Sequence, residues 1–556
     1  MIKILNRNAI CVILVCFSFL PMIAFPQSSD WEWVRVFGSK GADEINSACI
    51  DTQGNLYVAG YFQDEIDLDG IKLKSKGDND ILIAKFSNKG NLLWAQQAGG
   101  SYSENLIISE YAKKIAIDSD GNVIVTGCFM WEADFNGKLL KGPGNTDIFI
   151  AKYSQEGALL WVKSFGSEQH DYLYDMDTDE ENNIYLTGYL TGTFIQAPAI
   201  DDYKGSEFEG HGTTPFIAGL NAAGNLKWIR RDIGKADKTL IKVSSDRICY
   251  AVEYSSDLLM GSEYHSVTGN KDFIVQCLTT DGVLEWQHKF SSDNNEMIES
   301  LDVEEDGSML ISGKYGNIPE FKCFDINTEI RDQRTYYSKL SPDGSISWTS
   351  NNNSPAFPGG TKFSKFKDSK YYSTDVFSTR INVAGGDLIP DGKWFNSYVA
   401  LHDNLGKINE ILFSTPGIIK AVLPIDKSEY LVCGNYLSSS QTPYQKNSEG
   451  GFIDFFIGLK KLQLKNEAMA APSVVGPLDF DMNVFPNPAE NSCTLQTRNP
   501  VVAEQINITT TDGRILRNYF NCELPFKINL VGLASGIYLL SLKSGDVITS
   551  KILTIK

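Results

Sequence analysis

The sequence predicts an all-β chain in which one strand-rich unit is repeated seven times and followed by a smaller β domain. Three observations support this. A short glycine–tryptophan motif returns about every 60 residues, which indicates a repeat architecture. Glycine is abundant, with 47 residues, and 11% of the residues are aromatic, which favours turn-rich strands over helices. The strand missing from the last repeat stands at the start of the chain.

The motif has a glycine, an apolar residue and a tryptophan, with one free position between each. Its copies are Gly90-Asn-Leu92-Leu-Trp94, Gly157-Ala-Leu159-Leu-Trp161, Gly224-Asn-Leu226-Lys-Trp228, Gly282-Val-Leu284-Glu-Trp286 and Gly344-Ser-Ile346-Ser-Trp348. A sixth copy, at 406–410, has lost the tryptophan. Residues two apart on a strand share a face, and glycine suits a turn position with positive φ. We therefore expect a turn followed by a strand whose tryptophan packs.

The second unit shows the whole repeat. We expect a first strand at 111–118, a turn at 118–122, a second strand at 123–129, a polar loop, a third strand at 147–153 and a fourth strand carrying Trp161. Further second strands are predicted at 56–62, 184–190, 248–254, 309–315, 371–377 and 430–436. Further third strands are predicted at 81–86, 216–220, 273–278, 336–340, 397–401 and 452–459.

The third strands are nearly continuous apolar runs, such as Ile81-Leu82-Ile83-Ala84, which is typical of sheets covered on both faces. Four short antiparallel strands per unit, in seven units, predict a β-propeller. A solenoid of stacked sheets would share the local pattern but would need distinct capping repeats at both ends.

The fourth strands favour the propeller. The seventh unit continues into 460–466 without a tryptophan strand, while the N-terminal residues 31–38 resemble the fourth strand at 159–166. Placing that N-terminal strand beside the last sheet would close the ring and leave no unpaired inner edge. The prediction is a seven-bladed β-propeller over residues 30–465, with Trp33 against residues 452–459.

The repeat also resembles a known family. The segments Asp51-Thr-Gln-Gly-Asn55-Leu-Tyr57-Val-Ala-Gly60 and Asp147-Ile-Phe149-Ile-Ala-Lys152-Tyr153, with the glycine–tryptophan motif, are similar to the bacterial SBBP repeat. The resemblance is clearest in the first three units and fades in the last two. It implies a seven-bladed propeller and little chemistry.

The first 26 residues have the layout of a secretory signal peptide. Lys3 and Arg7 precede an apolar run from 9 to 25, interrupted by Pro21, and a polar stretch begins at Gln27. A single membrane anchor is the alternative, but the run is short for one, and no transmembrane segment is expected in the mature chain. The net charge of −19 argues against a nucleic-acid or anionic-membrane partner.

Residues 466–478 are small and contain proline, which predicts a linker. Residues 479–556 predict a small antiparallel β-sandwich. Its strands are expected at 493–496, 505–510, 514–519, 526–530, 536–542 and 548–555.

The last domain carries Phe485-Pro-Asn-Pro488, Asp512-Gly-Arg514, Leu533-Ala-Ser-Gly-Ile-Tyr-Leu539 and a final Lys551–Lys556 segment. These motifs resemble the type A C-terminal sorting domain of type IX secretion. The resemblance implies passage across a Gram-negative outer membrane by the type IX machinery, removal of the domain, and release or surface attachment. The sorting-motif residues would be Pro486, Asn487, Pro488, Gly513, Gly536 and Tyr538. Turn formation alone also explains these prolines and glycines.

The cysteines beyond residue 26 sit at different places in different repeats and show no metal-ligand spacing. Most are expected to be buried as small apolar residues. Cys493 and Cys522 are the first pair to test for a disulfide, because both lie in one small domain of an exported protein.

Repeated residues are interpreted as architecture. An aspartate recurs near the first turn of each unit, where its side chain can hydrogen-bond the turn backbone. These aspartates are Asp51, Asp118, Asp179, Asp246, Asp306, Asp368 and Asp426. The tryptophans are expected to pack between blades rather than to form a glycan platform.

Binding residues are expected where the units differ, on the face with the longer second-to-third loops and the blade-to-blade connections. The irregular loops are 191–215, 351–361 and 380–396. The candidate ligand-binding residues are Asp201, Asp202, Tyr203, Glu207, Glu209, His211, Asp387 and Trp394. The acidic loop could hold Ca²⁺ but lacks the spacing of a calcium loop, so a solvated loop is favoured and no cofactor or metal is predicted.

No catalytic residues are predicted. The five histidines, at 170, 211, 265, 288 and 402, have no metal-binding spacing, and no nucleophile elbow, phosphate loop or dinucleotide motif occurs. A carboxylate-pair glycosidase stays open, because such acids meet only in the fold. The favoured function is a secreted or surface-displayed, non-catalytic propeller that binds an extracellular protein or glycan. The alternatives are a polysaccharide hydrolase or lyase, and an envelope scaffold.

Overall fold

The computed structural model describes residues 31–100, 110–192, 214–244, 246–293, 295–316, 334–355, 362–365, 371–378, 381–383, 386–389, 395–426, 428–437, 453–461, 483–485, 488–489, 491–496, 502–510, 515–544 and 547–556. Every described element is a β-strand. The chain divides into two compact units, Met1–Gln463 and Leu464–Lys556. The predicted leader at 1–26 and linker at 466–478 lie outside the described residues.

Antiparallel four-stranded meanders make up the first unit. The first two are β2 (Glu44–Ile50), β3 (Leu56–Leu68), β4 (Ile71–Phe86), β5 (Leu92–Gly99), and β6 (Tyr111–Ile117), β7 (Val123–Phe135), β8 (Lys138–Tyr153), β9 (Leu159–Phe165). A short β5–β7 pairing joins these two into one eight-stranded sheet. The third is β10 (Tyr172–Thr178), β11 (Ile184–Leu190), β12 (Thr214–Leu220) and β13 (Leu226–Arg231).

Three further four-stranded sheets follow along the chain. They are β14 (Ala236–Ser244), β15 (Arg247–Tyr254), β18 (Asp272–Thr279), β19 (Leu284–Phe290); β20 (Asn295–Val303), β21 (Met309–Gly316), β22 (Arg334–Leu340), β23 (Ile346–Pro355); and β24 (Lys362–Lys365), β25 (Tyr371–Phe377), β28 (Asn396–His402), β29 (Ile408–Pro416). Two small hairpins are inserted, β16 (Leu258–Met260) with β17 (Glu263–His265), and β26 (Ile381–Val383) with β27 (Gly386–Leu388).

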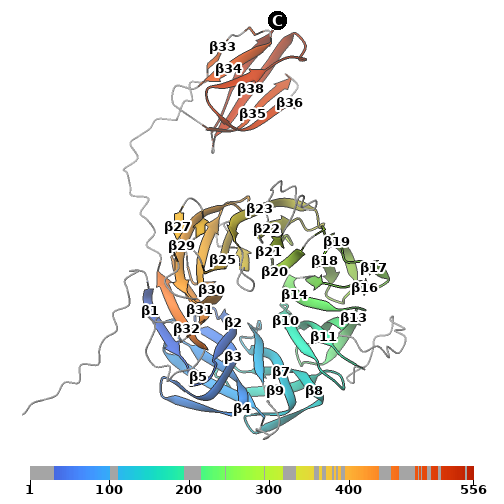
Figure 1. Cartoon of the computed structure of the whole chain (residues 1–556), viewed down its shortest axis with the longest axis vertical. Helices are drawn as coiled ribbons and strands as arrows, with labels where there is room; N and C mark the ends of the chain where they lie inside the picture. The colour runs from blue at the N-terminus through green and yellow to red at the C-terminus, as the bar shows by residue number, and fades with distance from the viewer. Residues whose placement is uncertain are drawn as a thin grey trace, which may run out of the picture. The chain divides into compact units, whose positions relative to one another are not determined.

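The last sheet combines both ends of the first unit. It contains β30 (Ile418–Pro424), β31 (Glu429–Leu437), β32 (Ile453–Lys461) and the N-terminal β1 (Trp31–Phe37). Strand β1 pairs antiparallel with β32, and Trp33 lies opposite Leu459 as the sequence predicts. The sheets follow one another around a common centre in a propeller-like arrangement, with β2, β10, β14, β20 and β30 nearest that centre (Figure 1).

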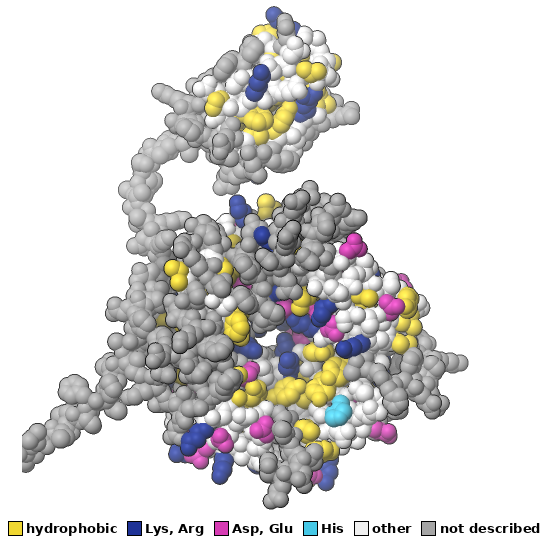
Figure 2. All heavy atoms as spheres, viewed as in Figure 1, with side chains coloured by type: hydrophobic (Ala, Val, Ile, Leu, Met, Phe, Trp, Pro, Cys, Tyr) yellow, Lys and Arg dark blue, Asp and Glu magenta, His cyan; other side chains and the backbone are white. Residues whose placement is uncertain are grey.

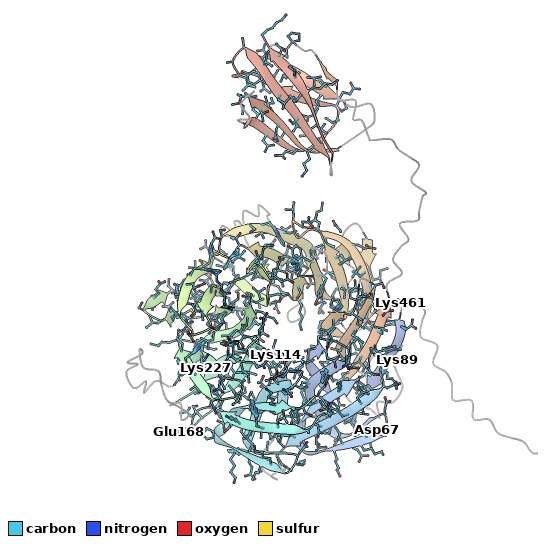
Figure 3. The ribbon with its side chains drawn as sticks, turned by 180° about the vertical axis from the view of Figure 1, so that it is seen from behind. Asp67, Lys89, Lys114, Glu168, Lys227 and Lys461 are labelled. Atoms are coloured by element: carbon cyan, nitrogen blue, oxygen red, sulfur yellow. The ribbon has the colours of Figure 1, made fainter. Side chains whose placement is uncertain are left out.

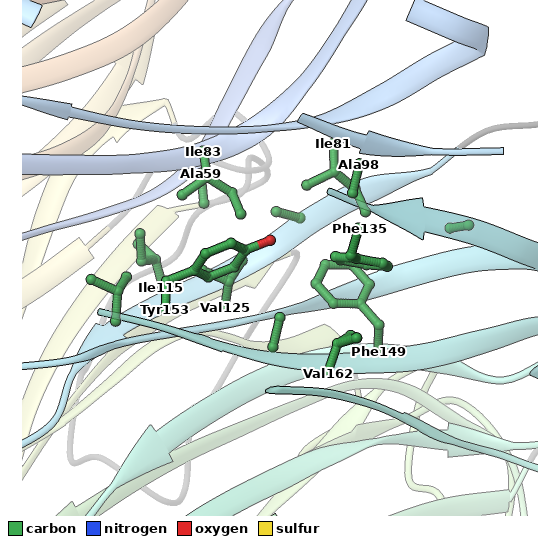
Figure 4. Close-up of a cluster of buried hydrophobic side chains, with 14 of the residues drawn as sticks. Ala59, Ile81, Ile83, Ala98, Ile115, Val125, Phe135, Phe149, Tyr153 and Val162 are labelled. Atoms are coloured by element: carbon green, nitrogen blue, oxygen red, sulfur yellow. The ribbon is translucent and has the colours of Figure 1, made fainter. Parts of the chain in front are cut away.

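The third strand of a meander is buried on both faces, as its apolar run predicts. Ile81 and Ile83 of β4 pack into the core shared with β6–β9, where Tyr153 lies close by (Figure 4). The alternate residues Leu82 and Ala84 pack into the core shared with β31 and β32. Because strand side chains alternate between faces, a single run of apolar residues joins one sheet to both neighbours.

Tryptophan–glycine contacts join the outer strands of six meanders to the meander that follows, as expected for packing tryptophans. The contacts are Trp33–Gly90, Trp94–Gly157, Trp161–Gly224, Trp228–Gly282, Trp286–Gly344 and Trp348–Gly406. A Cβ on any of these glycines would lie less than 3.0 Å from the indole. The glycines have φ between 70° and 85°, a conformation that side chains other than glycine's disfavour. Several indoles also donate to a backbone carbonyl near that turn, such as Trp94 Nε1 to Gln155 O at 3.0 Å.

The junction between the last and first sheets has additional contacts. Asn435 on β31 accepts a hydrogen bond from Ile45 N at 2.9 Å and donates to Ile45 O at 3.2 Å. Arg35 on β1 pairs with Asp69, at the tip of the β3–β4 hairpin, at 2.9 Å. These contacts replace chain continuity between residues far apart in the sequence.

The second-to-third connections differ from the predicted polar loops in the first two units. The structure extends β3, β4, β7 and β8 into long hairpins with tips at Asp69-Gly70 and Asn136-Gly137. All four tip residues have positive φ, as two-residue hairpin turns require. Strand β23 also extends to Pro355, into the predicted loop at 351–361.

The second unit contains two sheets around one core. One sheet has β33 (Asn483–Phe485), β34 (Ser492–Gln496) and β37 (Phe526–Asn529); the other has β36 (Ile515–Glu523), β35 (Val502–Thr510), β38 (Gly536–Ser544) and β39 (Val547–Ile555). Residues of both sheets form a single apolar cluster that includes Leu495 and Leu540. Cys493 and Cys522 are both buried and are not joined by a disulfide in the structure.

Replacing Gly157 by alanine tests the tryptophan contact. The new Cβ would meet Trp94 and force a strained backbone at φ 85°, so we expect the free energy of unfolding to fall by about 2–4 kcal/mol. Gly121→Ala is the matched control, because Gly121 has φ 81° but open space around its Cβ position, and it should cost only about 1 kcal/mol. Equal losses in urea unfolding would contradict a role for the contact.

Candidate functional site

Most of the predicted ligand-binding residues lie outside the described residues. These are Asp201, Asp202, Tyr203, Glu207, Glu209, His211 and Trp394. Asp387 lies in β27, where its backbone pairs with Asn382. The predicted loop-face site therefore stays a prediction.

The sorting-motif residues are partly described. Pro486, Asn487 and Gly513 lie outside the described residues, and Pro488 is exposed. Gly536 begins β38, and the buried Tyr538 donates its hydroxyl to Ala534 O at 2.7 Å. Tyr538 thus closes the turn before β38.

Several of the repeated aspartates bond the backbone of their turns, among them Asp51, Asp118, Asp179 and Asp426. Asp118 Oδ1 accepts the backbone N–H groups of Asp120 and Asn122, at 3.1 and 2.8 Å, and Asp51 accepts the equivalent pair in the first unit. A third-strand lysine completes the arrangement, since Lys152 Nζ lies 2.7 Å from Asp118 Oδ2. The oxygens of these carboxylates are therefore already bonded to the turn backbone and to a lysine.

In the fifth unit the predicted Asp306 does hydrogen-bond its own turn backbone, but a second acid takes part in the turn. There Glu304, not Asp306, holds the position equivalent to Asp51, because Glu304 O accepts the N–H of Gly307 and Lys339 pairs with Glu304 at 3.1 Å. Asp306 instead accepts the N–H of Ser308 at 2.9 Å. Asp368 lies outside the described residues.

His402 is a structural histidine. It is buried, its Nδ1 lies 2.8 Å from Gly406 O, and its Nε2 lies 2.8 Å from Ser373 Oγ. Burial lowers the pKa of His402 to about 4, so the ring is neutral and Nδ1 donates to the carbonyl. Among the described residues, no group of three or more His, Cys, Asp or Glu side chains could hold a metal ion.

Pairs of buried carboxyl groups, which the sequence analysis missed, lie at four sheet junctions. The pairs are Asp43 with Asp454, Glu110 with Asp80, Asp171 with Asp147, and Glu296 with Asp272. All eight residues are fully buried. In each pair, the N–H of the first residue donates to the carbonyl of the residue before its partner, as Asp171 N does to Thr146 O at 2.8 Å. The backbone thus sets the two carboxyl groups side by side.

The surroundings of these pairs favour a shared proton over a metal ion. Asp171 accepts from Ser167 and from Thr191 N, Asp147 accepts from Gly144 N, and Glu296 accepts from Ser292. Such N–H and O–H donors stabilise negative charge but repel a cation. Burial raises the pKa of Asp147 to about 7, with Asp171 adding to the rise, and Asp147 Oδ1 has no hydrogen-bond partner. One proton between the two carboxyl groups would satisfy that oxygen.

The centre of the first unit is lined by charged side chains from the innermost strands, and Figure 2 shows Lys and Arg side chains around the central hollow. Side chains of one strand bond the backbone of the next: Asp177 accepts from Val243 N at 2.9 Å, and Lys238 donates to Ile298 O at 3.0 Å. On the side of the centre formed by β10, β14 and β20, the charges of acids and lysines neutralise one another. Lys242 pairs with Asp177 at 3.5 Å, and Asp302 also lies near Lys242.

Lysines from β6, β24 and β30 dominate the other side. We define Lys113, Lys114, Lys362 and Lys420 as the lysine arc. Figure 3 places Lys114 at the centre around which the sheets are arranged. Lys362 Nζ donates to Lys420 O, which places β24 against β30. Burial and the charges of Lys114 and Lys420 lower the pKa of the half-buried Lys113, and the charges of the same two lysines lower that of the exposed Lys362.

Two lysines of the arc occupy β-bulges. The pairing register shifts between Ala112 and Lys114 on β6 and between Ile419 and Ala421 on β30, so Lys113 and Lys420 are the extra residues. A bulge changes the direction of a side chain, and the sequence carries no clear signal for it. The sequence analysis therefore missed the arc.

The C-terminal unit has a matching family. Residues 483–556 match the family described as the secretion system C-terminal sorting domain. This chain carries a type IX sorting domain. It is exported through that system to the cell surface or the medium of a Gram-negative bacterium. The described part of the chain includes no helix able to span a membrane.

Curated relatives match only parts of the chain. An uncharacterised WD repeat-containing protein of Acanthamoeba polyphaga mimivirus is 26% identical over 231 residues, covering 35% of this chain and 16% of the relative. The regulatory protein FlaEY of Caulobacter vibrioides is 24% identical over 310 residues, covering 53% and 32%. The chain thus spans about a third or less of the length of these relatives.

Similar solved structures are distant. The Neurospora crassa Pan2 WD40 domain has a TM-score of 0.37 at 10% identity, with 76% of this chain and 95% of that one covered. A fungal alcohol oxidase has a TM-score of 0.40 at 11% identity, covering 95% and 99%. A puromycin hydrolase has a TM-score of 0.38 at 8% identity, covering 91% and 60%. At these scores no mechanism transfers, and the fold rests on this chain's own strand pairing.

Asp147→Asn tests the shared proton. A carboxyl group whose folded pKa is raised stabilises the fold below its unfolded pKa, near 4, and this contribution is lost as pH rises through about 7. Neutral asparagine should therefore raise the free energy of unfolding at pH 8 by about 1–3 kcal/mol relative to the unsubstituted chain, with little difference near pH 4. Urea unfolding at the two pH values measures this, with exposed Glu65→Gln as control. A variant less stable at pH 8 than at pH 4, relative to the unsubstituted chain, would contradict proton sharing.

Proposed function

We propose that the first unit is a seven-bladed propeller closed by β1, and that it binds an extracellular protein or glycan without chemical turnover. The five four-stranded sheets and the eight-stranded sheet, counted as two meanders, support seven blades. The β1–β32 pairing and the Trp33–Gly90 contact support closure. The repeat motifs support assignment to the SBBP type. In this proposal the signal peptide covers residues 1–26, the propeller 30–465, the linker 466–478 and the sorting domain 479–556.

One observation carries the proposed binding face. The turns between third and fourth strands keep one hydrogen-bonding pattern, in which the turn glycine N–H donates three residues back, as Gly157 N does to Ser154 O at 2.9 Å. The described connections between second and third strands instead range from long continuous hairpins to small inserted hairpins. A constant scaffold with variable connections on one face is the usual arrangement of a binding protein.

A carboxylate-dependent hydrolase or lyase is the second candidate. Asp177 and Asp302 both lie near the centre, and burial raises the pKa of Asp302. Lys242 lies near both carboxylates and opposes that rise, as a structural ion pair would. Release of products from a polysaccharide, abolished by Asp302→Asn, would favour this candidate over non-catalytic binding.

The loop at 193–213 provides the test of the favoured function. The exported chain would be screened against glycans and surface proteins, then compared with a variant in which Asp201, Asp202, Glu207 and Glu209 are changed to the corresponding amides. Loss of four carboxylates from the binding face should weaken the detected interaction at least ~10-fold, or about 1.4 kcal/mol.

A matched control removes the same charge from the opposite face. Glu156, Glu180, Asp281 and Glu305 are exposed acids on the short turns, and their amide variants should bind as the unsubstituted chain does. Unchanged binding by the loop variant, or equal loss in the control, would contradict the proposed face.

A further inference from the structure

We propose that the lysine arc binds a compact oxyanion, a phosphate or sulfate group or the carboxylate of a single sugar acid, in the centre of the first unit. The four lysines come from three innermost strands, β6, β24 and β30. These lysines lie on strands and not in the loops of the proposed binding face, so either proposal can fail without the other.

The charge balance of the arc points to an anion. Lys114 pairs with Asp175 at 2.7 Å, and Lys420 lies 4.0 Å from Glu44. Within the described part of the chain, no carboxylate lies within ion-pair distance of Lys113 or Lys362. Among the described residues, four ammonium groups of the arc thus share two carboxylates.

The opposite side of the centre gives the comparison within one molecule. There Lys242 lies between the acids Asp177 and Asp302, and Lys238 pairs with Glu299 at 3.3 Å. Those lysines have their counter-charges within the protein. The excess of positive charge is therefore confined to the side formed by β6, β24 and β30.

The arc is partly buried and reaches solvent. Lys362 is exposed, while Lys113, Lys114 and Lys420 are half-buried. Charges of one sign in an enclosed site produce a stronger local potential than on an open surface. A small oxyanion can enter and accept hydrogen bonds from several ammonium groups, each a charge-assisted bond.

The size of the ligand follows from the rest of the chain. The protein carries a net charge of −19, which repels an extended polyanion at long range. A single anionic group, free or at the end of a neutral chain, meets this repulsion least. The probes are therefore inorganic phosphate, inorganic sulfate and glucuronate, which distinguish a free oxyanion from a sugar acid.

Binding should be linked to protonation of Lys362. The ionisable groups near this lysine are Lys114, Lys420, Asp175 and the thiol of Cys433. Two of these neighbours are cations whose charges lower the pKa of Lys362, so an anion placed among them would raise it. Affinity should therefore decline as rising pH deprotonates Lys362, and binding in that pH range should take up protons.

Calorimetric titration of the exported chain with each probe, in two buffers of different ionisation enthalpy, measures affinity and proton uptake. We expect one or more probes to bind, and Lys362→Gln or Lys420→Gln to weaken that binding at least ~10-fold. Lys141→Gln is the control, because Lys141 is an exposed lysine on the β8 hairpin and its substitution removes the same charge.

Lys362→Arg separates binding from folding defects. Arginine stays charged at pH 8, so this variant should bind the oxyanion while losing the proton uptake. Failure of all three probes to bind, unchanged affinity in both glutamine variants, an equal loss in Lys141→Gln, or unchanged proton uptake in Lys362→Arg would overturn the proposal.

Discussion

The contact between a tryptophan and the turn glycine of the next sheet is the interaction on which the first unit depends. The contact requires glycine for two reasons. The turn has a positive φ, and a Cβ at this position would collide with the indole. It also fixes distance, because the indole N–H reaches a backbone carbonyl of the same turn in pairs such as Trp228 with Thr280. One residue type at each position therefore sets turn, spacing and orientation together.

The same contact joins the last sheet of the first unit, which contains β1, to the first sheet. Trp33 makes with Gly90 the contact that other outer-strand tryptophans make with the following sheet. Where the sixth repeat has lost its tryptophan, no equivalent contact is described, and Phe413 packs edge-on against Trp31 of β1 instead, with ring centroids 6.2 Å apart. Apolar packing thus maintains that junction without the repeat motif.

Sequence reasoning could predict the strands, the paired N-terminal strand and the roles of the repeated residues, because each rests on local periodicity or on a recurring motif. The dipeptides Asp69-Gly70 and Asn136-Gly137 are strong two-residue turns, so the long hairpins were predictable where the sequence analysis expects polar loops. Glu304 shows why a search for a repeated aspartate is incomplete. The backbone of this turn keeps the geometry of the other units, but its acid is a glutamate.

The carboxyl pairs and the lysine arc could not be predicted in this way. Asp147 and Asp171 meet across a sheet junction through a backbone hydrogen bond that no spacing in the sequence reveals. Lys113 and Lys420 are brought into the arc by bulges on strands more than 300 positions apart. Both features arise where repeats meet, and they depend on which units become neighbours around the centre.

Hydrogen exchange in a Trp33→Ala variant of the exported chain tests the central claim most directly. If the Trp33–Gly90 contact holds the two ends of the first unit together, amides of β1 and β32 should exchange faster than in the unsubstituted chain, while β18 and β19 keep their protection. Unchanged protection in β1 and β32 would contradict the account.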